Sequence, residues 1–321
     1  FEISADILDE STLALISQAR EGLFQFEVGV QSTNPQTISS IRRSCDNHRL
    51  FANTAKLQSL HNVHIHADLI AGLPYEDYRS FAASFDDVFS MKPDMLQLGF
   101  LKVLKGSAME AEAPQYDIRY QSRAPYEVLS TRWLSYDDIL KLKKVERLVD
   151  MYYNSGRFQS CLPMAMAGYD SPFQFFEGLA LFFSEQGLLE RQAGKYDYYN
   201  FLYDSFKKSH GASQNFCWAA RHDIFCRENA KSPPEWASCS LFSIYRDKIE
   251  DFFANQICIE HYVPWLSGQE ARRISKIVHL EVYPVNPVKG TDETTAFLYD
   301  YSYRDINGNA KVYDVGKILF R

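Results

Sequence analysis

Polar side chains interrupt three short apolar runs of the sequence where strands of a sheet would end. Glu2 lies in the first run, Gln31 ends the second, and Asp68 lies within the third. A buried carboxylate or amide without a partner is costly, so each must be paired or face a cavity. Gly29 and Gly72 stand nearby and would let a ligand approach the backbone closely. This pattern predicts a ligand site built from acceptor groups at strand ends.

Arg43 and Glu27 are two further charged residues that could take part in binding or catalysis. Arg43 follows Gln31 in the chain and offers a planar fork of donors that suits a carboxylate. Glu27 and Asp68 could instead act as the acid and base of a different barrel enzyme, if both faced one cavity. Taken singly, Gln31, Arg43 and Asp68 would be better explained by ordinary surface or capping roles. Their ordered combination at a fixed spacing favours a functional site, but spacing alone does not show whether Glu27 and Asp68 face one cavity.

Histidine and cysteine give weaker signals. His64 and His66 would share one face of a strand without nearby cysteines, which favours a structural role over zinc binding. The six cysteines include no CxxC pair and no CxxxCxxC run. We therefore expect reduced, mostly buried thiols and no disulfide framework.

Composition excludes several classes of protein. The 321 residues are 46% hydrophobic, enough for a substantial core, and the net charge of -7 gives no broad positive field for nucleic acid. No run approaches the ~20 apolar residues of a membrane-spanning helix. We expect a cytoplasmic protein without membrane or nucleic-acid partners.

Strand and helix patterns alternate over residues 1–109, which is typical of βαβ units and a parallel sheet. Cap residues at Asp9, Asn34 and Glu76-Asp77 support the helix starts. The expected strands are Phe1–Ala5, Phe24–Val30, Val63–Ile70 and Met95–Val103, and the expected helices are Asp9–Ala19, Pro35–Arg43, Leu50–Leu60 and Tyr78–Phe89.

The pattern changes twice after the sheet. Residues 110–133 are predicted to form an irregular linker, and residues 134–270 a mostly helical domain with caps at Ser135 and Ser171. Over residues 271–321, period-two alternation and the turn at Asn307-Gly308 predict a small antiparallel β meander. Its last strand is expected over Val312–Phe320.

The ordered set Glu2, Gly29–Ser32, Arg43 and Asp68–Pro74 resembles the later strands of the radical S-adenosylmethionine (radical SAM) core. It is most similar to the branch with the anaerobic coproporphyrinogen oxidases, the Elongator-type enzymes and the cobalamin-binding relatives of the anaerobic Mg-protoporphyrin IX monomethyl ester oxidative cyclase. The run Leu96–Gly106 is similar to a cobalamin-binding-type family with an uncharacterised helical carboxyl-terminal domain. The resemblance implies an α/β fold, with the last four or so parallel strands of a partial TIM-like barrel in residues 1–109.

This resemblance also implies roles for the strand-end residues. In related oxidases, the acid that matches Glu2 contacts the methionine end of SAM. Residues that match Gln31 and Arg43 line the cofactor, and the acid that matches Asp68 helps to hold it. Secondary candidates are Glu27 toward the cofactor and Lys102 toward the substrate mouth, together with the glycines Gly29 and Gly72. Arg42 adjoins Arg43 and could take its place.

The family reduces SAM with a 4Fe-4S cluster on a CxxxCxxC loop and generates a 5′-deoxyadenosyl radical, with flavodoxin or ferredoxin as electron donor. It carries out oxidoreductase or methyltransferase-type chemistry on small molecules, and the substrate here is not identified. This sequence has neither that loop nor an amino-terminal cobalamin domain, and it opens on Phe1 rather than Met. We therefore expect a carboxyl-terminal fragment, inactive alone, whose partner is the missing amino-terminal part.

A competing hypothesis is a non-enzymatic α/β scaffold whose aromatic helical domain docks a protein partner. A CxxxCxxC loop in the coding sequence upstream of Phe1 would favour the enzyme. Its absence would favour the scaffold.

Overall fold

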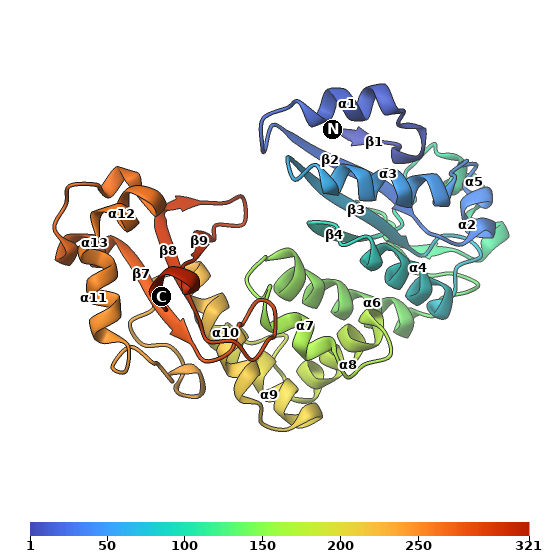
Figure 1. The fold of residues 1–321 in the computed structure, drawn as a ribbon. Coiled ribbons are helices and arrows are strands. Elements are labelled where there is room, and N and C mark those ends of the chain that lie inside the picture. Colours follow the sequence, from blue (N-terminus) through green and yellow to red (C-terminus); the bar gives the residue numbers. More distant parts are fainter. Residues whose placement is uncertain (321) are drawn as a thin grey trace. The chain divides into compact units, whose positions relative to one another are not determined.

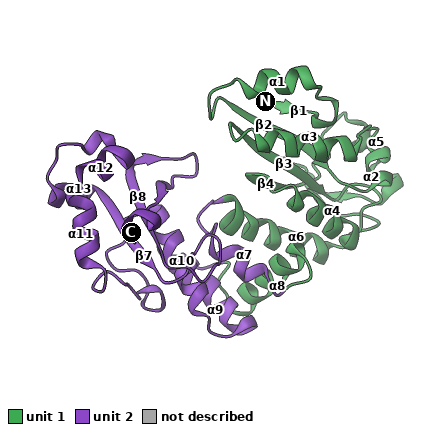
Figure 2. Cartoon of the chain, in the orientation of Figure 1, with its two compact units in different colours: residues 1–154, 169–189 green, residues 155–168, 190–321 purple. Residues whose placement is uncertain are grey.

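The computed structural model describes residues 1–320, which form two compact units (Figure 2). Unit 1 contains residues 1–154 and 169–189, and unit 2 contains residues 155–168 and the chain from residue 190 onward. Among the described residues, no helix is long and apolar enough to cross a membrane.

A four-stranded parallel sheet with the order β1-β2-β3-β4 lies at the centre of unit 1 (Figure 1). Its strands are β1 (Glu2–Ile3), β2 (Phe24–Gln31), β3 (Val63–Ala71) and β4 (Met95–Phe100). The α/β fold with four parallel strands, many helices and a separate antiparallel sheet is therefore confirmed. The last strand is shorter than predicted, because the N–H of Leu101 makes the last bond to β3, at Ala71, and the chain then bonds to the linker instead.

The helices of the βαβ units start at side-chain caps. Asp9, Asn34 and Asp77 each accept a hydrogen bond from a backbone N–H two or three residues later, as predicted. Asp46 caps a further helix, so that helix begins three residues before the predicted Leu50. The elements are η1 (Ala5–Ile7), α1 (Glu10–Ser17), α2 (Pro35–Ser40), α3 (Asn47–Ser59) and α4 (Tyr78–Ser90).

The two faces of the sheet differ sharply. Alternate residues such as Val28, Ile65 and Leu69 are fully or almost fully buried, on the side that α3 and α4 cover (Figure 1). The side chains between them, including Glu27 and Asp68, stay exposed or half-buried on the other face. Helices thus cover one face of the sheet and leave a polar face open.

The predicted linker contains short regular elements: α5 (Ala108–Glu112), η2 (Ala113–Tyr116), β5 (Arg119–Tyr120) and β6 (Val128–Ser130). β5 and β6 pair antiparallel. Val128 of β6 is buried against Gly72, at the end of β3. The linker is therefore part of unit 1, and it packs on the carboxyl end of the sheet.

Two long helices of the expected helical domain belong to unit 1. α6 (Tyr136–Val149) starts at a capping box of Ser135 and Asp138 and continues as the π-helical turn η3 (Asp150–Asn154). α8 (Pro172–Glu185) starts at the cap Ser171. α6 and α8 pack against each other and against α4 and β4, so the helices predicted for residues 134–270 are shared between the two units.

Unit 2 combines helices with the antiparallel sheet β7-β8-β9. Its helices are α7 (Cys161–Met166), α9 (Asp197–His210), α10 (Gln214–Arg227), η4 (Glu235–Ala237), α11 (Arg246–Ala254), α12 (Gln256–Tyr262), η5 (Pro264–Leu266), α13 (Ala271–Ile277) and α14 (Gly316–Leu319). Its strands are β7 (Val278–Tyr283), β8 (Thr295–Arg304) and β9 (Ala310–Asp314). α10 is buried without interruption from Phe216 to Phe225. It therefore forms the centre of this unit.

The β meander is confirmed, but its last strand is shorter than predicted. β8 and β9 are joined through the expected turn, where Gly308 has a φ of +79°. β9 ends at Asp314, whose Oδ1 accepts from the N–H of Gly316, and α14 follows. Residues from Gly316 to Leu319 are thus helical rather than extended.

Gly72 provides a test of the packing between the linker and the sheet. Its φ is +92°, and a Cβ at this position would lie 2.8 Å from Cγ1 of Val128. Gly106 has a φ of +78° but no atom within 4 Å of its Cβ position, so it is the matched control. Both alanine variants should lose about 1 kcal/mol to backbone strain, and Gly72→Ala a further 1–3 kcal/mol or so to overpacking. Chemical denaturation measures both values, and equal losses would contradict this packing.

Candidate cofactor-binding site

Three acids of the predicted site lie side by side on the polar face of the sheet. Strand pairing sets Glu2 beside Glu27 and Gly29 beside Asp68. These side chains come from β1, β2 and β3, with Glu27 in the middle of β2 and Asp68 three residues before the end of β3. The structure thus brings together acids that lie far apart in the sequence.

Asp68 is the most perturbed of these acids. Burial, a hydrogen bond with the Glu27 carboxyl and the negative charges of Glu27 and Glu2 together raise the pKa of Asp68 to about 7. Its Oδ1 atom is buried and has no hydrogen-bond partner among the described residues. Asp68 and Glu27 therefore form a carboxyl pair that holds a proton near neutral pH and retains a free acceptor.

A bulge in β2 brings Gln31 over Gly29, where the Arg43 side chain also lies. The register of β2 against β3 shifts between Gly29 and Gln31, and Gln31 has a φ of +69°. A Cβ at Gly29 would lie 2.6 Å from Nε2 of Gln31 and 3.5 Å from both terminal nitrogens of Arg43. The Oε1 atom of Gln31 is buried and accepts no hydrogen bond from any described residue. A larger residue at position 29 would therefore clash with the Gln31 side chain.

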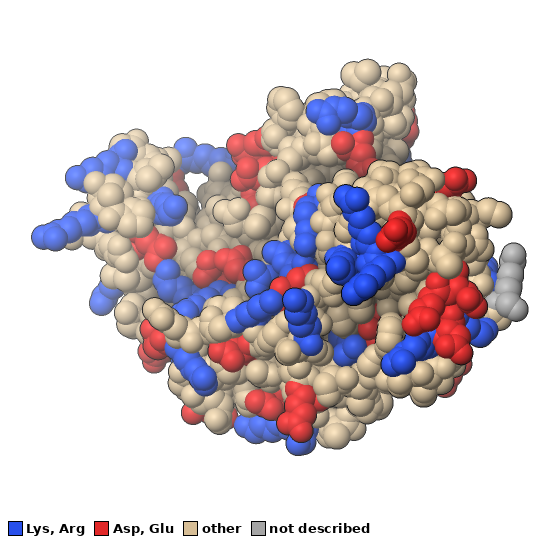
Figure 3. Space-filling view, turned by 90° about the vertical axis from the view of Figure 1, so that its left-hand side faces the viewer, with Lys and Arg blue, Asp and Glu red and all other residues tan. Residues whose placement is uncertain are grey.

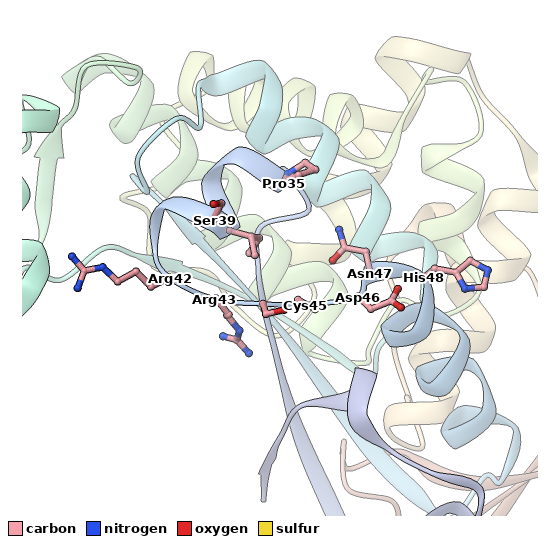
Figure 4. A pocket seen from close by; sticks show the side chains of 10 residues that line it. Pro35, Ser39, Arg42, Arg43, Cys45, Asp46, Asn47 and His48 are labelled. Atoms are coloured by element: carbon pink, nitrogen blue, oxygen red, sulfur yellow. The ribbon is translucent and has the colours of Figure 1, made fainter.

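Arg43 and Arg42 have different surroundings, which distinguishes the two candidates. Arg42 is 74% exposed at its side chain and forms an ion pair with Glu112. Arg43 points from the loop toward the strands, whereas Arg42 points away from them (Figure 4). Both line a hollow of about 720 Å³ together with Cys45 and Asp46. Arg43 is therefore the arginine that faces the polar residues of β2.

A buried carboxyl fixes the segment that follows Gln31. Glu76 is fully buried and accepts hydrogen bonds from Ser32 Oγ at 2.6 Å and Ser84 Oγ at 3.0 Å. Burial raises its pKa to about 7, although both hydroxyls act to lower it. Ser84 Oγ also accepts from the N–H of Thr33 at 3.0 Å. Glu76 thereby anchors the loop between β2 and α2.

The other two predicted residues lie apart from this group. Val128 occupies the space next to Gly72, so that glycine accommodates the linker. Lys102 is exposed, and its backbone forms an isolated bridge with Glu127. Among the described residues, neither contacts Asp68 or Arg43 through a hydrogen bond or an ion pair. Their roles toward a ligand stay predictions.

Three residues near this site were not assigned to it from the sequence. Gln97 pairs with Asp68 in the sheet register, and His66 pairs with Glu27. The alternation Met95, Gln97, Gly99 was the available signal for Gln97. Glu76 was expected only as a helix-start residue, because nothing in its local sequence shows that Ser32 and Ser84 surround it.

Histidines and thiols show no metal site among the described residues. His64 and His66 share a strand face as predicted, with ring centroids 4.9 Å apart, but no group of three His, Cys, Asp or Glu side chains is placed to hold an ion. All six cysteines are free. Cys161, Cys217 and Cys258 are buried, whereas Cys239 is exposed.

Comparison with known families gives a match over more than half of the chain. Residues 114–298 match a family described as protein of unknown function (DUF4080), which is more than half of the chain. The chain belongs to the DUF4080 family. The DUF4080 region runs from the linker through α13 and β7 into β8, so the parallel sheet with its polar face precedes it.

Other comparisons add little for this DUF4080 protein. No curated protein matches it. One similar solved structure is "Coproporphyrinogen III oxidase (HemN) from Escherichia coli is a Radical SAM enzyme", with 22% identity and a TM-score of 0.33. The match covers 44% of this chain and only 30% of that one. A likeness of this size supports no conclusion about fold or function.

The buried Glu76 should give the stability of the DUF4080 protein a pH dependence. Because its pKa rises from 4.5 to about 7 on folding, the folded state binds more protons across that interval and loses stability as pH increases through it. Glu76→Gln removes this contribution, which amounts to at most about 3 kcal/mol. Denaturation at a series of pH values measures the difference from wild type. A Glu76→Gln variant whose stability changes with pH as steeply as that of the wild type would contradict the assignment.

The pairing of Asp68 with Glu27 predicts that the pKa of Asp68 depends on its acidic neighbours. Glu27→Gln removes one charge beside Asp68 and should lower the pKa of Asp68, while burial keeps it above the usual 3.8. Glu2→Gln should lower it less, because Glu2 contributes the smallest effect. NMR titration of labelled Asp side chains measures all three proteins. An Asp68 that titrates near 3.8 in the wild type would refute the pairing.

Proposed function

We propose that the polar face of the sheet is one wall of a SAM-binding site in a radical SAM enzyme. The observation that carries this proposal is the convergence of Gln31 and Arg43 over Gly29, beside the Glu27–Asp68 carboxyl pair. The same residues were selected from the sequence by their resemblance to the radical SAM core. Because these residues lie on one face of the sheet, a single bound cofactor could contact all of them.

The residues fit the chemistry of SAM. Gln31 Oε1 and Asp68 Oδ1 are buried acceptors without partners, which a ligand with an ammonium group and ribose hydroxyls would satisfy. The Arg43 guanidinium suits the carboxylate of the methionine end. Bound SAM would supply the group that is reductively cleaved. The contribution of this chain would be to bind and orient it.

The 4Fe-4S cluster would have to be held by another part of the protein. Within the described part of the chain, no group of three His, Cys, Asp or Glu side chains is placed to hold a metal ion. Cobalamin, flavodoxin or ferredoxin as electron donor, and a small-molecule substrate remain parts of the proposal that come from the resemblance alone. So does the cytoplasmic location, which suits six free thiols.

We propose that the amino-terminal part of the same protein packs against β1. At the opposite edge of the sheet, Asn154 caps β4, because its side chain bonds both the N–H and the C=O of Leu96. No described strand pairs with the outer edge of β1. In the helical segments that follow β1, Ile7 and Leu15 are 73% and 70% exposed. An unpaired edge beside exposed apolar side chains suits a further strand and helix.

A second enzymatic candidate rests on the same carboxyl pair. Glu27 and Asp68 face one side of the sheet, and the pKa of Asp68 lies near neutrality, which suits general acid–base chemistry without SAM. This candidate assigns no role to Gln31 or Arg43. Variants of Arg43 and Asp68 therefore distinguish the radical SAM proposal from the acid–base proposal.

Two other partner classes gain less support. A docking role for aromatic helices is weakened because Phe175, Phe176 and Phe183 are buried in the core. On the face in Figure 3, basic side chains gather near the middle with acidic ones among and beside them. With a net charge of -7, this surface suits no general nucleic-acid partner.

Arg43 and its neighbour Arg42 provide a matched test in the full-length protein. After anaerobic reconstitution with iron and sulfide, Arg43→Gln should weaken SAM binding at least about tenfold, because a charge-assisted pair is lost. Arg42→Gln removes an equal charge from an exposed ion pair and should leave SAM binding unchanged. Equilibrium binding of labelled SAM and its cleavage on reduction are the measurements.

Two results would refute the radical SAM proposal. One is a reconstituted full-length protein that neither becomes coloured nor binds SAM. The other is an Arg43→Gln variant that binds SAM as tightly as Arg42→Gln. Retained catalysis in Arg43→Gln with loss in Asp68→Asn would favour the acid–base enzyme.

A further inference from the structure

A second polar cavity lies entirely within unit 2. It has a volume of about 280 Å³ and is lined by Arg157, Lys195, Tyr196, Tyr199, Arg227 and Glu228, with Ile224 as its apolar contact. The basic residues come from the loop before α7, the loop before α9 and the last turn of α10. Helix folding therefore gathers three cations that are distant in sequence around one small space.

Only one of these cations has an acid partner in the cavity. Lys195 forms an ion pair with Glu228, whose other oxygen accepts a hydrogen bond from Tyr196 Oη at 2.9 Å. The Arg157 guanidinium has no ion pair, and its Nε is buried without an acceptor among the described residues. The cavity thus keeps two guanidinium charges after its single carboxylate is counted.

The two arginines are held in place despite their like charges. Nη1 of Arg227 donates to the carbonyl oxygen of Asn307 in the turn between β8 and β9. The buried Tyr199 donates from Oη to the carbonyl oxygen of Arg157 at 3.2 Å, which fixes the backbone there. Burial and the nearby Arg157 charge lower the pKa of Arg227. Two fixed, partly desolvated guanidinium groups favour an anion between them.

We propose that this cavity binds the phosphate group of a small molecule, with Arg157 and Arg227 as its ligands. A phosphate monoester carries about -1.5 to -2 charge at pH 7 and therefore matches the two unpaired guanidinium groups, whereas a carboxylate would leave one of them unmatched. The cavity is smaller than the usual ~300–1,000 Å³ of drug-sized ligand sites, so it suits the phosphate end of a ligand. All residues that line the cavity lie within the DUF4080 region. The proposal does not depend on the proposed SAM site.

Titration calorimetry of the purified protein at low salt, with phenyl phosphate, inorganic phosphate and acetate as probes, tests this proposal. Both phosphates should bind at least tenfold more tightly than acetate. Tighter binding of phenyl phosphate would identify a phosphorylated small molecule as the ligand class, and tighter binding of inorganic phosphate would identify the free ion. Arg157→Gln should weaken phosphate binding at least about tenfold, because a charge-assisted contact is lost.

Arg272→Gln is the matched control, since Arg272 is an exposed arginine of α13 outside the cavity. It should bind phosphate as the wild type does. Circular dichroism checks that each variant folds. If Arg157→Gln does not fold, Arg157→Lys keeps the charge without the planar fork and should still weaken binding several-fold. The proposal is overturned if the wild type binds no phosphate, or if the Arg157 and Arg272 variants bind it equally.

Discussion

The difference between the two faces of the parallel sheet is the constraint on which unit 1 depends. Because side chains alternate along each strand, the burial of Val28, Ile65 and Leu69 under helices forces Glu27, His66 and Asp68 onto the opposite face. A shift of one residue in register would bury the acids and expose the core. Hydrophobic burial on one side therefore determines where the polar groups stand on the other.

Local deviations then refine this arrangement. The bulge in β2 turns Gln31 back over Gly29, and the buried Glu76 holds the next residue, Ser32, through its hydroxyl group. A regular strand would carry Gln31 away from Arg43. The proposed cofactor site thus depends on a carboxyl that itself lies outside the polar face, in the segment before α4.

Much of unit 1 could be predicted from the sequence because its signals are local. Caps such as Asp9 and Asp77 and the strand-end polar residues identify elements and an edge of the sheet. The association of α6 and α8 with unit 1 could not be predicted, since apolar periodicity shows that a face is buried without showing its partner. Likewise, Glu76 and Arg157 obtain their surroundings from contacts across many residues of sequence, which no spacing rule reveals.

The continuous burial of α10 has a consequence for recognising relatives of this protein. A helix with a solvent-facing side tolerates many substitutions there, but Phe216 to Phe225 all lie inside unit 2. Each position must fit neighbours on every side, and the polar members Arg221, His222 and Asp223 must also keep their bonding partners. This decapeptide should therefore change more slowly than its surroundings, and it should serve as a fingerprint for distant members of the family.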